Sequence, residues 1–140
     1  MLVGTGQADQ RAEAAEAVDP VELMALAAQR AGGPAVLKAV DAIRVVNLLS
    51  WRYRDPGLLL GQRIGATAAS TRYSGVGGNV PQSLVNQACL DIQRGRADVV
   101  LLAGAETWRT RMRLKARGLK PDWPRQDDSV ARPRAATMCR

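Results

Sequence analysis

Residues 73–107 constrain the fold of this chain more than any other stretch, because two strand-like segments there flank a glycine corner and a helix. The corner reads Gly77-Gly78-Asn79, and Pro81 stands in the first turn of the helix, where proline is favoured. In α/β enzymes such a strand-to-helix corner often presents a nucleophile. Here none of the three corner residues is Ser, Cys or His, so any site at this corner is expected to rely on backbone groups.

The helix after the corner has one apolar face. Leu84, Ala88 and Ile92 recur every four residues, which is the spacing of a buried helix face. Cys89 is expected on the same stripe, as a small buried side chain without a catalytic role. Gly95 is expected to end the helix. The apolar run ADVVLLAGA then predicts a strand that is covered on both faces, as in a parallel sheet.

The rest of the chain alternates strands and helices in the same way. Residues 1–7 predict a short strand, and further strand-like runs begin at residues 43 and 70. Two helix starts carry an Asp-Pro pair, Asp19-Pro20 and Asp55-Pro56, in which the carboxylate caps free N–H groups. This order predicts an α/β fold, a three-layer αβα arrangement with a mostly parallel sheet. The predicted core includes Val45, Val46, Leu84, Ala88, Ile92, Val99, Val100 and Leu101.

The net charge of +7 is unevenly distributed over the 140 residues, a length that suits one domain with its own core. Residues 1–106 contain equal numbers of acidic and basic side chains, so the excess positive charge lies in residues 107–140. A solvated basic segment is the simpler interpretation, and a phosphate or polyanion site is the alternative. We expect a basic helix to about Gly118 and disorder from residue 130 onward.

Two residue types limit the chemistry. The sequence has no histidine, which removes the usual Ser-His and Cys-His pairs and argues against a zinc site. Its two cysteines, Cys89 and Cys139, match no metal-ligand spacing, so no metal is expected. No apolar run is long enough to span a bilayer, and the N-terminus lacks a signal-peptide pattern. We therefore expect a cytoplasmic protein without a membrane partner.

The stretch from Ser83 to Thr107 resembles the thiolase superfamily, in which a helix ending in isoleucine leads through Gly and Ala-Asp-Val into a strand closed by Gly-Gly-x-Glu. The matching residues are Ile92, Gly95, Ala97-Asp98-Val99 and Gly104-Ala105-Glu106, with Ala105 in place of one glycine. VDPVELMALAAQRAGG is similar to the family's first helix, and IRVVNLLSW to its second strand. The resemblance covers about residues 1–125. It implies a thiolase-like N-terminal half-domain over residues 1–106 and the start of a basic loop region at 107–125. Residues 126–140, which follow the loss of periodicity after Pro121, are expected to form a disordered tail.

The resemblance also implies what the corner has lost. Catalytic thiolases carry their nucleophilic cysteine just before the matching helix, and the family spacing puts that position at Gly78. Their catalytic histidines and second cysteine belong to a C-terminal half, so we expect this chain to be a fragment. It is similar to acetyl-CoA acetyltransferase-like proteins of lipid metabolism that lack the nucleophile. We expect the parent protein to bind an acyl-CoA, and this chain alone to bind one weakly or not at all and not to catalyse acyl transfer.

The expected site combines the corner with the start of the basic region. In such a site the amides of Gly78 and Asn79, beside Gly77, bind a thioester carbonyl oxygen. Arg109 and Arg111 pair with CoA phosphates. The expected ligand is a CoA thioester, with no bound cofactor. A lone half-domain leaves apolar surface uncovered, so we also expect marginal stability and self-association or a partner half.

Other interpretations stay open. Gly4-x-Gly6 suggests a dinucleotide-binding turn, although Asp9 replaces the third glycine of that fingerprint. The corner glycines, with Gly75, can serve only to supply positive φ for a tight turn. The basic region and its tryptophans can bind nucleic acid, but alternating arginines scatter their charge around a helix. A non-catalytic interaction protein is the remaining alternative.

Overall fold

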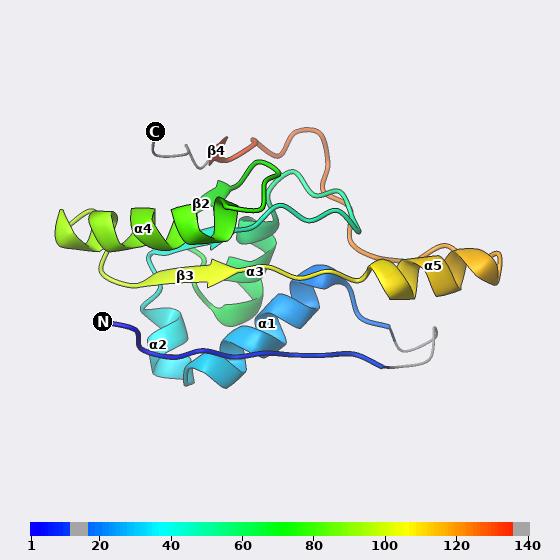
Figure 1. The fold of residues 1–140 in the computed structure, drawn as a ribbon, viewed down its shortest axis with the longest axis horizontal. Coiled ribbons are helices and arrows are strands. Elements are labelled where there is room, and N and C mark those ends of the chain that lie inside the picture. The colour runs from blue at the N-terminus through cyan, green and yellow to red at the C-terminus, as the bar shows by residue number, and fades with distance from the viewer. Residues whose placement is uncertain (12–16, 136–140) are drawn as a thin grey trace.

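The computed structural model describes residues 1–11 and 17–135 (Figure 1). Its elements are α1 (Pro20–Ala31), α2 (Pro34–Lys38), β1 (Ala42–Val45), α3 (Pro56–Ile64), β2 (Ser70–Tyr73), α4 (Val80–Gln93), β3 (Val100–Ala103), α5 (Trp108–Ala116) and β4 (Arg134–Ala135). The α/β class and the parallel sheet predicted from the sequence are confirmed. Within the described ranges, no helix is long and apolar enough to cross a membrane.

β1 is an inner strand of the sheet, whose order is β3-β1-β2-β4 and whose pairs are all parallel. In register, Arg44 of β1 lies between Arg72 of β2 and Leu102 of β3. Because side chains alternate along a strand, these three share one face of the sheet, while Ile43 and Val45 belong to the other. Helices α1 and α3 lie on one side of the sheet and α4 on the other (Figure 1).

The main hydrophobic core fills the space between the sheet and the helices α1 and α3. Ile43 and Val45 of β1 are fully buried there, against Val21 and Met24 of α1 and Leu60 of α3. On the other side of the sheet, Leu84 and Ala88 of α4 are buried as predicted. The predictions for Val46, Val99, Val100 and Leu101 are only partly met, because these side chains are half-buried. Three of those four belong to β3 or its start, and β3 is an edge strand.

The two Asp-Pro pairs start helices as predicted. Asp19 caps α1, accepting from the amides of Val21 at 2.8 Å and Glu22 at 3.2 Å. Asp55 caps α3 by accepting from the Leu58 amide at 2.9 Å. In each helix the proline after the cap takes a position whose N–H would have no intrahelical partner, so it costs no hydrogen bond.

Residues 1–7 do not form the predicted strand. They run alongside α1 (Figure 1), and two glycines bring the segment against the helix backbone. A Cβ on Gly4 would lie 1.8 Å from the carbonyl oxygen of Ala31, and a Cβ on Gly6 would lie 2.1 Å from that of Ala27. These glycines therefore serve close packing on α1. In residues 7–11, where the description of this segment ends, no helix opens as a dinucleotide fingerprint would require.

The C-terminal segment packs back onto the domain. The side-chain oxygen of Gln126 accepts from the amides of Arg54 at 2.9 Å and Asp55 at 2.8 Å, and its Nε2 donates to the Asp55 carbonyl at 2.7 Å. β4 then pairs with the free edge of β2. Disorder was expected from residue 126, whereas residues 126–135 make these specific contacts. Residues 136–140 of the expected tail lie outside the described residues.

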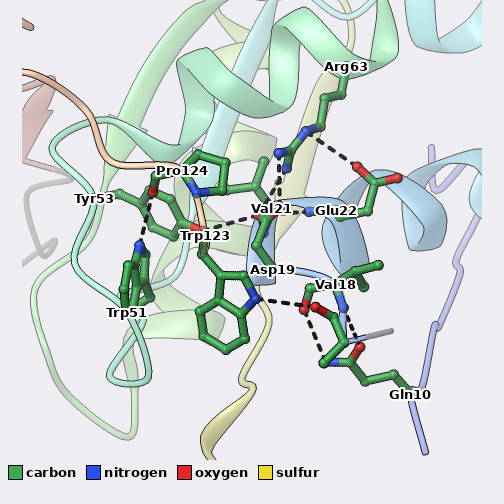
Figure 2. A network of polar contacts seen from close by, with 11 residues as sticks. Gln10, Val18, Asp19, Val21, Glu22, Trp51, Tyr53, Arg63, Trp123 and Pro124 are labelled. Atoms are coloured by element: carbon green, nitrogen blue, oxygen red, sulfur yellow. Dashed lines mark hydrogen bonds and ion pairs between the residues drawn. The ribbon is translucent and has the colours of Figure 1, made fainter. Parts of the chain in front are cut away.

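Asp19 also lies at the centre of a polar network that joins α1, α3 and the loop after β1 (Figure 2). Its carboxylate accepts from the Tyr53 hydroxyl at 3.1 Å and from the two Nη atoms of Arg63 at 3.0 and 2.9 Å. Arg63 reaches Glu22 as well, at 3.3 Å. Burial, reinforced by the charge of Asp19 and the hydrogen bond to it, raises the pKa of Tyr53. The phenol therefore stays protonated and donates.

Two tryptophans fasten the C-terminal segment to the same loop (Figure 2). The rings of Trp51 and Trp123 meet edge to face, with centroids 5.3 Å apart and planes at 78°. The Trp51 indole N–H donates to the Pro124 carbonyl at 3.0 Å, and that of Trp123 donates to the Ala17 carbonyl at 3.3 Å. Trp123 is 7% exposed, so it acts as an apolar anchor for residues 121–130.

Candidate functional site

The carboxyl ends of β1, β2 and β3 meet at one edge of the sheet, where open α/β sheets bind their ligands. The chain runs from β1 to β2 through α3, and then returns past β1 to β3 through α4 on the opposite face. The two connections therefore diverge between β1 and β3. This is the position at which a parallel sheet leaves a crevice between the loops that follow its strands.

Glu106 ties together the loops that follow β1 and β3. Its two carboxylate oxygens accept from the amides of Leu49 at 2.6 Å and Ser50 at 2.9 Å. The buried Ser50 hydroxyl in turn accepts from the Thr107 amide at 3.1 Å and lies 3.2 Å from the Thr107 hydroxyl. By accepting from these two amides, Glu106 orders the loop after β1 at the edge of the site.

A second set of contacts links the loop after β1 to the end of β2. The Ser74 hydroxyl accepts from the Asn47 amide at 2.9 Å, and the Asn47 side chain donates to the Ser74 carbonyl at 3.2 Å. The Tyr73 hydroxyl accepts from the Leu48 amide at 2.9 Å. Burial chiefly, with the charge of Glu106, raises the pKa of Tyr73, although the bond from Leu48 opposes this. The phenol is therefore a neutral structural partner of the loop.

The glycine corner follows directly from Ser74 and is the most open part of this edge. Residues 75–79 are exposed. The positive-φ interpretation of the glycines is wrong, because Gly75, Gly77 and Gly78 all have negative φ. A Cβ built on Gly75 or Gly78 would meet nothing within 4 Å. Neither turn geometry nor packing within the domain therefore explains why these two positions lack a side chain.

The corner also leaves backbone donors available. Val80 donates to the Gly77 carbonyl at 3.2 Å, and Ser83 donates to that of Asn79 at 3.1 Å. By contrast, the amides of Gly77, Gly78 and Asn79 have no protein acceptor among the described residues. The Asn79 side chain makes no capping bond to α4. Three exposed N–H groups therefore stand at the N-terminus of a helix, where the helix dipole favours a negative or oxygen-rich ligand group.

The two arginines predicted to join the corner differ in their surroundings. Arg111 donates to the Ser50 carbonyl at 3.1 Å, and its guanidinium lies 5.6 Å from the centre of the Trp108 ring. Arg109 is exposed and makes no hydrogen bond or ion pair within the part of the chain that the structure describes. No hydrogen bond or ion pair between described residues joins either arginine to the corner. Arg109 is thus the freer of the two cations.

Cys89 and Ile92 are exposed, so the prediction that both lie on the buried stripe of α4 is wrong. The helix instead turns Gln87 and Asp91 toward the sheet, because Asp91 pairs there with Arg44. The face of α4 that packs on the sheet therefore includes a charged residue, and it differs from the face that the apolar pattern predicts. Cys89 is ten residues after Asn79 and therefore lies roughly 15 Å along the helix from the corner.

Other candidate chemistry at this site is limited. Among the described residues, no group of three or more His, Cys, Asp or Glu side chains gathers where a metal ion could bind. A shallow hollow of about 480 Å³ is lined by residues 121–125, where the guanidinium of Arg125 lies 5.5 Å from the centre of the Trp51 ring. This hollow belongs to the C-terminal segment and not to the strand ends.

The sequence interpretation missed the residues that organise the site. Ser50, Asn47 and Ser74 carry no motif, and their roles depend on contacts across the sheet. Glu106 left a signal, since it follows a predicted buried strand at the edge where loops gather.

Comparison with protein-family models, with curated protein sequences and with solved structures finds no match to this chain.

Proposed function

We propose that this protein binds an acyl-CoA thioester at the glycine corner and does not itself carry out acyl transfer. One observation carries the proposal. The corner presents the amides of Gly77, Gly78 and Asn79 to solvent, beside glycines whose lack of a side chain nothing in the domain requires. Missing side chains over free N–H groups let a ligand approach the backbone closely.

The ligand class follows from the donors. Backbone amides at a helix N-terminus suit a carbonyl oxygen that carries partial negative charge, and the thioester carbonyl of an acyl-CoA is such a group. CoA phosphates would pair with the exposed guanidinium of Arg109 through charge-assisted hydrogen bonds. Arg111 contributes less in this proposal, because it already binds the Ser50 carbonyl. The resemblance to the thiolase superfamily supports the same ligand.

The absence of catalysis is part of the proposal. Gly78 occupies the position of the family's nucleophilic cysteine, and the sequence has no histidine to act as a base. Cys89 lies on the outer surface of α4, away from the corner. In this proposal the protein is a non-catalytic relative of acetyl-CoA acetyltransferases, working in the cytoplasm and in lipid metabolism. A partner half or a second copy would cover the half-exposed strand β3.

Calorimetric titration of CoA and acetyl-CoA tests the proposal, with a variant that blocks the corner. Gly78→Val places a branched side chain over the free amides, at a position where the backbone and the space tolerate it. We expect affinity to fall by roughly tenfold or more. Gly33→Val is the matched control, because a Cβ on Gly33 also meets nothing and its φ is −68°. Equal affinity of the two variants would show that the corner is only a turn.

Arg109 and Cys89 give two independent checks. Arg109→Gln should weaken CoA binding several-fold and reduce its dependence on salt, whereas binding of a thioester without phosphates should not change. Incubation with acetyl-CoA should leave Cys89 unmodified by mass spectrometry. If neither CoA nor acetyl-CoA binds, the better interpretation is a non-catalytic interaction protein. An acetyl group on Cys89 would contradict the proposed lack of chemistry.

A further inference from the structure

Helix α5 lies at one end of the molecule, beyond the end of the sheet (Figure 1). Leu114 is its single buried residue, and Thr110, four positions earlier, lies 3.4 Å from the Gln10 side chain. Residues four apart share a helix face, so Thr110 and Leu114 define the inner face of α5. The opposite face is open to solvent.

The outer face of α5 carries an apolar ridge. Trp108 is 52% exposed and Met112 is 47% exposed, and these residues are also four positions apart. Met112 precedes Leu114 by two positions, which is about half a turn of an α-helix, so the ridge faces away from the body. Leu119, just after the helix, is 53% exposed. A surface helix would ordinarily turn charged side chains outward at these positions.

Cations flank the ridge on both sides. Arg109 and Arg113 follow the two ridge residues by one position, and each step along a helix rotates the side chain by about 100°. Lys115, three positions after Met112, lies on the other flank, and Arg111 on that side donates to the Ser50 carbonyl at 3.1 Å. No acidic residue occurs from Thr107 to Pro121, and Lys120 adds to the positive charge.

We propose that α5 docks on an anionic membrane surface, with Trp108 and Met112 entering the boundary between headgroups and acyl chains. In this orientation the flanking cations reach the lipid phosphates, because long basic side chains extend outward from an apolar stem. Tryptophan favours this boundary. An apolar face bordered by Lys and Arg is the pattern of helices that lie in the plane of the interface. This proposal departs from the expectation, drawn from the sequence, of no membrane partner.

The order of side chains favours a lipid surface over a nucleic acid. Trp108 and Met112 are exposed together on the outer face, so a surface that accepts apolar side chains beside cations suits this helix better than phosphates alone. A flat interface accepts the ridge and both flanks at once. The proposal goes beyond CoA binding and does not depend on it, because the glycine corner precedes α4 and only Arg109 belongs to both proposals.

Vesicle co-sedimentation of the full chain tests the proposal, with vesicles of phosphatidylcholine alone or mixed with phosphatidylserine. We expect binding to the mixed vesicles that falls as salt rises. Arg113→Gln with Lys115→Gln should lower the partition coefficient roughly thirtyfold. Arg30→Gln with Arg94→Gln removes the same charge from exposed sites outside α5, and it should have a much smaller effect. Arg109 is left unchanged, so the result is independent of CoA binding.

The apolar ridge is tested separately, with one double variant and one matched control variant. Trp108→Ala with Met112→Ala should lower binding roughly tenfold or more. Val85→Ala with Ile92→Ala is the control, because those residues of α4 are 42% and 41% exposed. Thermal melts should show that all four variants fold. Equal loss in both apolar pairs, equal binding to vesicles without phosphatidylserine, or no binding at all would overturn the proposal. Binding of a single-stranded oligonucleotide but of no vesicle would assign the ridge to nucleic acid instead.

Discussion

Arg44 of β1 and Asp91 of α4 form an ion pair inside the protein, on the face of the sheet opposite the main core. Arg44 is 3% exposed and Asp91 is 6% exposed. Arg96 adds a second contact to Asp91 at 2.7 Å. The Nε and Nη1 atoms of Arg44 have no hydrogen-bond partner among the described residues. Since a buried pair loses hydration on both sides, we expect it to select which face of α4 meets the sheet more than to add stability.

Removing one member of this pair should destabilise the protein strongly. Asp91→Asn leaves the Arg44 charge buried without a counter-charge, so we expect the free energy of unfolding to fall by about 3–5 kcal/mol in urea denaturation. The exposed Asp98→Asn should stay within about 0.5 kcal/mol of the parent chain. Replacing both Arg44 and Asp91 by Leu should cost less than Asp91→Asn alone. If the double variant is the least stable, the pair itself contributes net stability.

The Arg44–Asp91 pair should also make the stability of the fold depend on pH in the acid range. Burial alone would raise the pKa of Asp91, but the hydrogen bond and charge of Arg44, helped by Arg96 and Arg72, outweigh it and hold the pKa below its ordinary value. The folded state therefore binds this proton less readily than the unfolded state. The contribution of Asp91 is present above about pH 4 and is lost as pH falls further. Urea midpoints from pH 7 downward should drop steeply for the parent chain and less for Asp91→Asn.

Both tyrosines should resist ionisation while the protein is folded. The pKa of Tyr53 and that of Tyr73 are raised, in each case chiefly by burial. Because folding favours the neutral phenol, this stabilisation is complete below about pH 10, the ordinary tyrosine pKa, and is lost as pH rises above it. Ultraviolet absorbance at pH 10 should show little tyrosinate in the folded chain. Adding urea at the same pH should produce the signal of two half-ionised tyrosines, and substantial ionisation before unfolding would contradict the assignment.

Trp123 should be the main anchor of the C-terminal segment. Its ring is buried against Trp51, so Trp123→Ala removes a large apolar contact and should cost about 3–5 kcal/mol of unfolding free energy. Trp108→Ala, at an exposed position, should change stability by no more than about 0.5 kcal/mol. Limited proteolysis should then cut the Trp123→Ala chain within residues 121–130. Resistance to cleavage there would mean that Gln126 and Arg54 hold the segment without the tryptophan.

Local signals in the sequence predicted α1, α3, α4 and α5, but not the short helix α2. The Asp-Pro pairs at Asp19 and Asp55 announce the first turns of α1 and α3, because a capping carboxylate and a proline act within a few residues. Gly95, expected to end α4, has a φ of +63°. Features that depend on distant partners were not predictable in this way. The inner face of α4 is set by Arg44 from another element, and no periodicity within the helix contains that information.

The same distinction explains the two ends of the chain and the site. Residues 1–7 have strand-like composition, but Gly4 and Gly6 fit against α1 so closely that the segment lies outside the sheet. The edge of β2 is covered by β4 instead. At the candidate site, the open corner at Gly78 was predictable from its glycines. The ties made by Glu106 and Ser74 depend on strand order, which the local sequence does not encode.

The position of β1 has a consequence for biosynthesis. Its partner β2 lies within the next thirty or so residues of the chain, so α1, β1, α3 and β2 can assemble soon after they leave the ribosome. Arg44 is already in that assembly, yet Asp91 follows it by 47 residues. Until α4 emerges, we expect the charge of Arg44 to keep the bare face of the nascent sheet hydrated and to disfavour premature association there. We therefore expect Arg44, which is buried in the complete fold, to protect the incomplete chain from association during synthesis.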